Sequence, residues 1–205
     1  MGGPTKPAAQ SNHVHGHGKL SLAGRADAPL LLVFGGIPVG GVQSGVYMWN
    51  YMNALKDRYH IFVATSNTTP GTLAYKAVMA KLASDDIDIT PSEQILYLFS
   101  GGYGPGMNVL HSSGPATFSA IHLVDIWMGN KTVADFYKKL ADTNSGKMTY
   151  TYTTFGANSP ETRDYIADRL GPTRATLVEA LGEGKKKEGG MATHLRTNTI
   201  ALLNL

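Results

Sequence analysis

From Leu30 onward the chain alternates short apolar runs with longer stretches whose apolar residues recur at helical spacing. The run LLLVF occupies residues 30–34, a helical pattern covers residues 45–59, and HIFVA resumes as a strand at residues 60–64. This order favours a parallel sheet, because consecutive parallel strands need a crossover connection that is most often a helix. We therefore predict an α/β fold with a three-layer, mostly parallel sheet and helices on both faces.

The same reading extends to the rest of the chain. It predicts further strands at residues 95–99, 121–127 and 148–153, and further helices at residues 72–83, 106–111, 133–140 and 160–170. The segment ATLVEAL at residues 175–181 fits a strand or a helix, and so does the ending TNTIALLNL.

The chain has 205 residues, 42% hydrophobic and 16% charged, which suffices for one substantial core but not for two ordinary enzyme domains. We predict one domain over residues 29–205. Residues 1–28 are dominated by Gly, Pro, Ser, Asn and Ala without apolar periodicity, and we predict a flexible tail there. Its alternating His13, His15 and His17 could chelate a transition metal if the segment were extended, and the alternative is a flexible tail that binds metal only incidentally.

Charge and composition limit the classes of partner that we expect for the chain. The net charge of +3 is spread along the chain, and the basic run Lys185 to Lys187 stands among Gly and Glu as in a solvated loop, so we expect no nucleic-acid partner. No apolar run approaches the ~18 residues of a membrane-spanning helix, and the N-terminus lacks signal-peptide features, which favours a cytoplasmic location. The chain contains no cysteine. We expect a small-molecule substrate, no cofactor and no metal, and leave the oligomeric state open.

The segment ILYLFSGGYGPG places Ser100 between a buried strand and a helix that begins with small residues. This pattern predicts a strand–turn–helix elbow that lifts the serine hydroxyl out of the sheet edge, with the Gly101 N–H aimed at the same space. A glycine-rich turn that binds a phosphate, or that only connects two elements, is the competing interpretation.

Four histidines lie outside the tail. His60 begins a strand, His111 follows the elbow, and His122 lies in an apolar strand, where a hydrogen-bonded core histidine is the usual explanation. His194 lies in the polar segment GGMATHLRTNT, which we predict as a loop that reaches back over the sheet edge. It is the candidate general base, and an ordinary surface histidine is the alternative.

The candidate acid is Asp125, the only charged group in the apolar stretch IHLVDIWMG. A carboxylate in such surroundings needs a partner to offset its desolvation, and an imidazole is one such partner. A helix cap or a pair with Lys131 is the competing interpretation. Glu161 is the reserve candidate, although it stands at a predicted helix start, where a carboxylate already has a structural role.

The chain resembles a small α/β-hydrolase in four motifs: LLLVFGG, the elbow LFSGGYGPG, the strand and acid LVDIWMG, and the histidine segment ATHLRTN. The resemblance implies that Ser100 attacks a carbonyl carbon, that His194 moves the proton, and that Asp125 holds the imidazole. It also implies an oxyanion hole made by Gly101 together with Gly36 or Ile37. Residues near these motifs that would line a substrate site are Tyr103, Met107, Trp127 and Met128.

The chain departs from the family pattern at one position. The elbow usually reads G-x-S-x-G, and the residue two before the serine is Leu98, whose bulk predicts a crowded turn. The leading hypothesis is a serine hydrolase that cleaves an ester or amide. The alternatives are a non-catalytic domain that binds a nucleotide-sugar or another small ligand at turns such as FGGIPVGGVQSG, and a degenerate hydrolase fold used for binding.

Overall fold

The computed structural model describes residues 11–14, 16–84, 87–154, 159–179 and 190–205. The strands are β1 (Ser11–Val14), β2 (Gly18–Ser21), β3 (Leu30–Phe34), β4 (His60–Ala64), β5 (Gln94–Phe99), β6 (Ala120–Val124), β7 (Met148–Tyr152) and β8 (Ala175–Leu177). The α-helices are α1 (Ser44–Met52), α2 (Gly71–Leu82), α3 (Tyr103–Ser113), α4 (Lys131–Asn144), α5 (Pro160–Leu170) and α6 (Gly190–Ala201).

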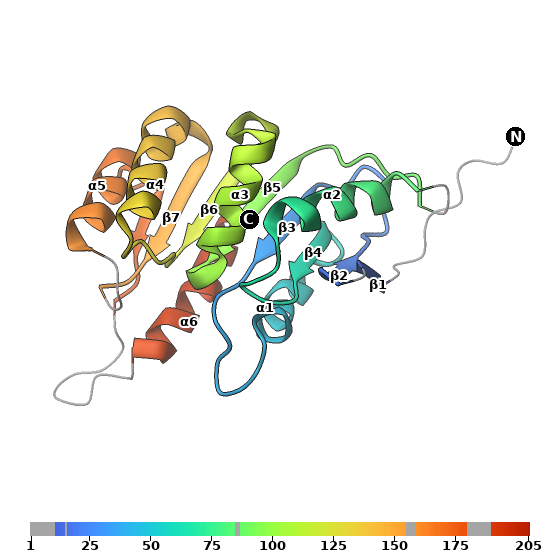
Figure 1. Ribbon diagram of the computed structural model, residues 1–205, viewed down its shortest axis with the longest axis horizontal. Helices are drawn as coiled ribbons and strands as arrows, with labels where there is room; N and C mark the ends of the chain where they lie inside the picture. The colour runs from blue at the N-terminus through green and yellow to red at the C-terminus, as the bar shows by residue number, and fades with distance from the viewer. Residues whose placement is uncertain (1–10, 15, 85–86, 155–158, 180–189) are drawn as a thin grey trace, which may run out of the picture.

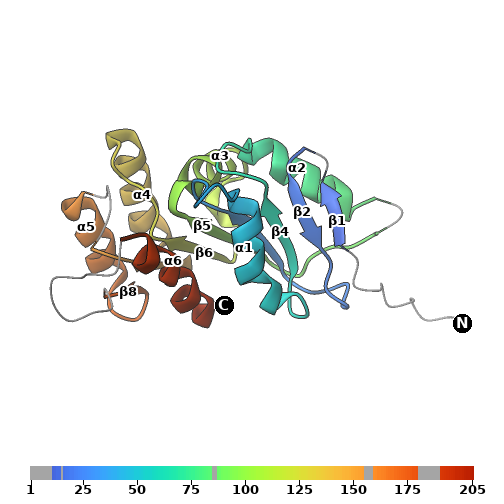
Figure 2. The same cartoon turned by 90° about the horizontal axis from the view of Figure 1, so that it is seen from below.

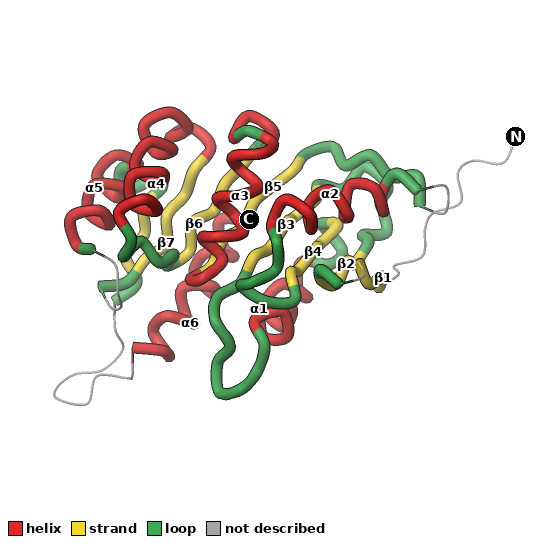
Figure 3. The backbone as a smooth tube through the Cα atoms, in the orientation of Figure 1, coloured by secondary structure: helices red, strands yellow, loops and turns green. Residues whose placement is uncertain are grey.

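The strands of the described residues form one sheet in the order β1-β2-β4-β3-β5-β6-β7-β8 (Figure 1, Figure 3). Strand β2 is antiparallel to both of its neighbours, and every other pair is parallel. The predicted α/β fold with a mostly parallel sheet is confirmed. Because β3 to β7 run in one direction, the loops that follow them gather at a single edge of the sheet.

Helices cover both faces of the sheet, as predicted. Helices α1 and α6 lie on one face, and α2, α3, α4 and α5 lie on the other (Figure 2). The alternation of side chains along a strand divides the core in two. In β3, for example, Leu32 and Phe34 belong to the cluster under α2 to α5, whereas Leu31 and Val33 belong to the cluster under α1 and α6.

The segment predicted as a flexible tail, residues 1–28, is structured over its second half. Strands β1 and β2 form a hairpin, and β2 pairs with β4. Leu20 is fully buried opposite Phe62, so a single apolar residue anchors a strand too short to show a period. Residues 1–10 and His15 lie outside the described residues. Within the described part of the chain, no three His, Cys, Asp or Glu residues are grouped to hold a metal.

The structure also decides between strand and helix for the two segments near the C-terminus that the sequence left open. Residues 175–177 are strand β8, and the chain ends in helix α6, which carries His194. The loop predicted around His194 is therefore wrong. Helix α6 was hidden in the sequence because the side chains that it buries include polar ones, Thr197 and Asn198, so an apolar period is weak there. The run Lys185 to Lys187 lies outside the described residues.

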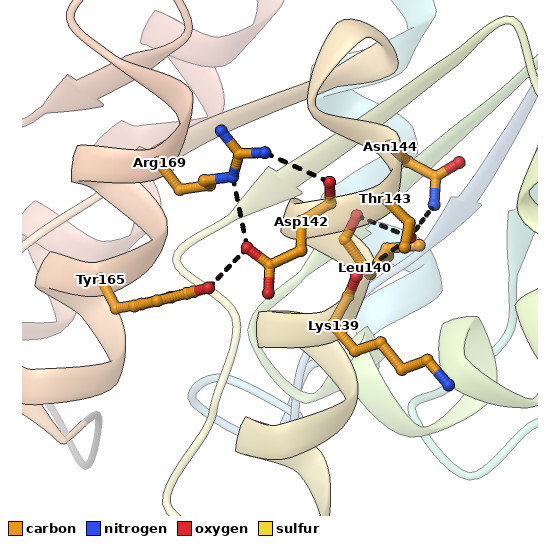
Figure 4. Close-up of polar contacts among 7 residues, drawn as sticks. All are labelled: Lys139, Leu140, Asp142, Thr143, Asn144, Tyr165 and Arg169. Carbon is orange, nitrogen blue, oxygen red and sulfur yellow. Dashed lines mark hydrogen bonds and ion pairs between the residues drawn. The ribbon is translucent and has the colours of Figure 1, made fainter.

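Helices α4 and α5 are joined by a polar cluster on the surface (Figure 4). The Asp142 carboxylate accepts hydrogen bonds from the Tyr165 hydroxyl at 2.5 Å and from Arg169 Nε at 3.2 Å. These exposed contacts hold the two helices side by side at one end of the sheet. In the part of the chain described, no helix has the length and apolar character to cross a membrane.

His122 is the core histidine that the sequence predicts. It is buried on β6, and its Nδ1 lies 2.8 Å from Thr149 Oγ1 on β7. Burial disfavours the charged imidazolium and lowers the pKa of His122 from 6.5 to about 4. Between pH 6.5 and about 4, His122 is therefore protonated in the unfolded chain but remains neutral in the folded protein.

We expect the free energy of unfolding to fall as the pH is lowered from 6.5 to about 4, with His122 accounting for up to about 3 kcal/mol. His122→Gln keeps a polar side chain but does not titrate, so its stability should fall less over this interval. Urea unfolding at pH 7.5, 5.5 and 4.5 measures the difference between the variant and the parent protein. Parallel stability curves for the two proteins would contradict this account of His122.

Candidate active site

The candidate residues of the sequence meet at the edge of the sheet where the parallel strands end. Ser100 follows β5, Asp125 follows β6, and Gly36 follows β3. Strand β5 lies between β3 and β6, so the serine stands between the glycine-rich loop and the acid.

Ser100 occupies a sharp turn. Its φ is 52°, in the left-handed region that non-glycine residues rarely adopt, and a short 3-10 turn (Ser100–Gly102) leads directly into α3. The Ser100 carbonyl accepts a hydrogen bond from Trp127 N at 3.2 Å, which ties the turn to the loop after β6. The strand, turn and helix predicted from ILYLFSGGYGPG are present.

The crowding predicted from Leu98 does not occur, because the helix supplies the missing space. Leu98 is fully buried, and a Cβ on Gly106 of α3 would lie only 2.3 to 2.4 Å from its methyl carbons. The α/β-hydrolase pattern has a small residue two positions before the serine, where this chain has Leu98. Gly106 on the facing helix leaves the space that the leucine side chain occupies. The close approach of strand and helix at the elbow is preserved.

Asp125 also has a left-handed φ, of 42°, and its side chain is buried. Its carboxylate accepts hydrogen bonds from Thr153 N at 3.1 Å and from Thr153 Oγ1 at 2.9 Å. These two donors require the carboxyl group to act as an acceptor. Thr153 was not singled out in the sequence, although its position directly after β7, beside the end of β6, could have indicated it.

His194 completes the set of hydrogen bonds to this carboxylate. Its Nδ1 lies 2.6 Å from Asp125 Oδ2, and since the carboxylate is an acceptor, Nδ1 carries the proton and donates. In the neutral imidazole, Nε2 is then free to accept a proton. The ring stacks on Phe99, with centroids 4.5 Å apart, and Phe99 is the residue immediately before Ser100.

The structure brings Asp125 and His194 into direct contact and places both beside the elbow. Among the contacts of the described residues, no hydrogen bond joins Ser100 Oγ to His194. The other candidates lie elsewhere. His60 and His122 are buried within the fold, and Glu161 is exposed in the first turn of α5.

The glycine-rich loop after β3 approaches the serine from the other side. A Cβ on Gly36 would stand 2.8 Å from Ser100 Oγ, so only glycine fits there. A Cβ on Gly101 would lie 3.4 Å from Ile37 N, which places the backbone of Ile37 beside that of Gly101. Ile37 is one of the two candidates for the second oxyanion donor, and its backbone nitrogen is among the atoms nearest to this position.

Tyr47 of α1 holds this loop and was missed in the sequence. Its hydroxyl donates a hydrogen bond to the Ile37 carbonyl at 3.0 Å. Burial raises the pKa of Tyr47 to about 12, so the hydroxyl stays protonated as a donor. The Tyr47 ring also packs edge-on against Phe99. Phe99 thus contacts both the histidine and the residue that holds the loop.

The predicted substrate-lining residues divide into two groups. Tyr103 and Trp127 are half-buried beside the elbow, with ring centroids 5.2 Å apart, and Met107 is half-buried on α3. Met128, in contrast, is buried and belongs to the hydrophobic core cluster. An apolar residue next to a site motif is as readily part of the core beneath it.

Solved structures share this architecture. Est1E from Butyrivibrio proteoclasticus aligns over 97% of this chain and 98% of its own, with a TM-score of 0.55 and 11% identity. The fold is that of the α/β-hydrolases. Carboxyl esterase 2 from the mycorrhizal fungus Tuber melanosporum aligns over 98% of this chain and 86% of its own, with a TM-score of 0.55 and 14% identity. An α/β-hydrolase from Novosphingobium aromaticivorans aligns over 99% and 100%, with a TM-score of 0.52 and 12% identity.

Neither a protein-family model nor a curated protein sequence matches the chain. The chain therefore shares with these three structures the arrangement of the backbone, because its sequence identity to each of them is 14% or less.

The left-handed backbone at Ser100 of this α/β-hydrolase fold leads to a stability prediction. Ser100→Gly and Ser100→Ala both lack the hydroxyl, but only glycine adopts this φ without strain, so we expect the glycine variant to be more stable by about 1 kcal/mol. At Lys139, exposed within α4, the alanine variant should instead be the more stable of the pair. Urea unfolding of the four variants measures both differences, and an alanine variant at least as stable as glycine at position 100 would contradict the strain.

The contact between Leu98 and Gly106 leads to a second prediction. Gly106→Ala should destabilise the protein by about 1 to 3 kcal/mol, because the buried leucine has little room to move. Leu98→Ala should cost about 2 to 5 kcal/mol by leaving a cavity. In the double variant the new methyl group occupies part of that cavity, so the free energies of unfolding should show a favourable coupling of at least about 0.5 kcal/mol. Additive losses would show that the two positions do not compensate.

Proposed function

We propose that the chain is a serine hydrolase that cleaves an ester or amide bond through an acyl-enzyme, with Ser100 as nucleophile, His194 as base and Asp125 as acid. The observation that carries the proposal is the 2.6 Å contact between His194 Nδ1 and the buried Asp125 carboxylate, next to a serine on a strained turn. A buried carboxylate that orients an imidazole beside a serine at a strand–helix turn is the arrangement that activates such a nucleophile.

In the proposed acylation step, Ser100 Oγ attacks the carbonyl carbon of the substrate, and its proton moves to His194 Nε2. Asp125 stabilises the imidazolium while remaining a carboxylate. The tetrahedral intermediate collapses as Nε2 returns the proton to the leaving alcohol or amine. Water then attacks the carbonyl carbon of the acyl-enzyme and gives its proton to His194 Nε2. The imidazolium returns that proton to Ser100 Oγ as the bond to the acyl group breaks, which releases the acid.

The negative charge that develops on the carbonyl oxygen needs hydrogen-bond donors that are already in place. We assign this role to the backbone N–H groups of Gly101 and Ile37, whose residues lie side by side across the mouth of the elbow. The hydrogen bond from Tyr47 to the Ile37 carbonyl holds the next peptide group along the chain, between Ile37 and Pro38, and so restrains Ile37 before substrate arrives.

The surroundings of the serine favour a small substrate with an apolar or aromatic part. Tyr103 and Trp127 lie on the α3 side of the elbow, and Ile37, Val42 and Val46 are exposed on or next to the glycine-rich loop. Two structural neighbours agree with this class: Est1E was solved with ferulic acid bound, and another neighbour is a dienelactone hydrolase from Anabaena variabilis.

A fluorophosphonate probe tests the nucleophile. We expect it to label one residue of the folded protein, and mass spectrometry should locate the adduct on Ser100. Labelling of Ser44 or Ser66, or none at all, would remove the central claim. A folded but unlabelled protein would favour a small-ligand-binding domain or a degenerate hydrolase.

The base and the acid are tested by turnover of a p-nitrophenyl ester. His194→Ala and Asp125→Asn should each lower turnover by ~10³ or more, as for loss of a triad member. His111→Ala, exposed near the end of α3, serves as the matched control and should retain activity. Full activity in His194→Ala would show that another group acts as the base.

A further inference from the structure

The loop between β4 and α2 brings a side-chain amide to the proposed oxyanion hole. The point where a Cβ on Gly101 would stand lies 3.4 Å from Asn67 Nδ2 and also 3.4 Å from Ile37 N. The Asn67 amide nitrogen and the Ile37 backbone nitrogen therefore both lie close to Gly101, the residue that follows Ser100.

The Asn67 amide makes no hydrogen bond to any residue of the described chain. Its neighbours hold the turn without it. Ser66 N donates to Thr69 Oγ1 at 3.2 Å, and the hydroxyls of Ser66 and Thr68 are 2.9 Å apart. Within the described part of the chain, this half-buried amide therefore keeps two N–H donors that a ligand could accept from. The turn is shaped by the residues around Asn67, which leaves the amide free for another role.

Sheet order gives this amide its position relative to the catalytic groups. Strand β4 lies beside β3, β3 beside β5, and β5 beside β6. Asn67 lies in the loop after β4 and therefore reaches Ser100 from the β3 side of strand β5. Asp125, which follows β6, lies on the other side of β5. A donor at Asn67 can contact the carbonyl oxygen of a substrate without disturbing the histidine and acid.

We propose that Asn67 is a catalytic residue whose side-chain N–H donates a third hydrogen bond to the oxyanion. The inference rests on the acyl-transfer function proposed above. An amide aimed at the space where charge develops stabilises the transition state more than the neutral ground-state carbonyl, so its loss lowers kcat more than it raises KM.

The test compares Asn67→Ala and Asn67→Asp with the parent protein, using p-nitrophenyl acetate for turnover and phenylboronic acid as the tetrahedral oxyanion analogue. Asn67→Ala should lower kcat by about 10²-fold, on the scale of losing one oxyanion donor, with KM within about twofold. The inhibition constant for phenylboronic acid should rise with the loss in kcat. Asn67→Asp has the same shape but offers a carboxylate in place of a donor, so it should lose more activity than alanine.

Two further variants make the result decisive. Asn50→Ala, exposed on α1, is the matched control and should behave as the parent protein. Ser100→Ala defines the activity that remains without the nucleophile. If the parent is active, Ser100→Ala is inactive and Asn67→Ala keeps the parent kcat or the parent affinity for phenylboronic acid, the role of Asn67 is overturned while the hydrolase function stands. A parent protein inert to ester and to fluorophosphonate would overturn both.

Discussion

The Asp125 carboxylate is buried at the end of β6 and accepts hydrogen bonds from Thr153 N, Thr153 Oγ1 and His194 Nδ1. Removing a carboxylate from water is costly unless such donors replace the lost hydration. These bonds connect three elements that are distant in the chain: β6, the end of β7 and helix α6. The imidazole cannot be oriented unless all three are in place, so the chemistry proposed for Ser100 depends on this group.

Backbone strain marks the same region. Ser100 and Asp125, at the ends of the neighbouring strands β5 and β6, both have left-handed φ angles although neither is glycine. Such conformations persist where the surroundings enforce them, and they gather at functional sites. The hydrogen bond from Trp127 N to the Ser100 carbonyl links the two turns directly. Of the described non-glycine residues with a left-handed φ, two thus lie at this edge of the sheet, and the third, Asp88, lies in the connection between α2 and β5.

Phe99 shows how packing and polar geometry are joined. Its ring stacks on His194 and meets the ring of Tyr47 edge-on, while the Tyr47 hydroxyl holds the Ile37 carbonyl. One aromatic side chain, buried immediately before Ser100, therefore contacts His194 and also Tyr47, which holds the glycine-rich loop after β3. The packing of Phe99 thus connects His194 and the glycine-rich loop to the end of β5.

Much of the fold followed from local patterns in the sequence. The apolar runs at β3, β4, β5 and β6, the helical stretches between them and the turn at Ser100 depend on neighbours within a few residues, and periodicity reports such neighbours. Asp125 was identified in the same way, as a lone charge in an apolar run. What these patterns determined was the order of the elements and which polar residues stand at strand ends.

Only the tertiary structure decided which of those residues meet. The contact of Asp125 with His194 spans 69 positions, and the helix that carries His194 buries polar residues and so lacks an apolar signal. The residues Thr153, Tyr47 and Asn67 come from separate elements: the end of β7, helix α1, and the loop between β4 and α2. The bulk of Leu98 is accommodated by Gly106 on the facing helix. A local pattern contains no information on contacts between distant segments, because packing across the sheet sets them.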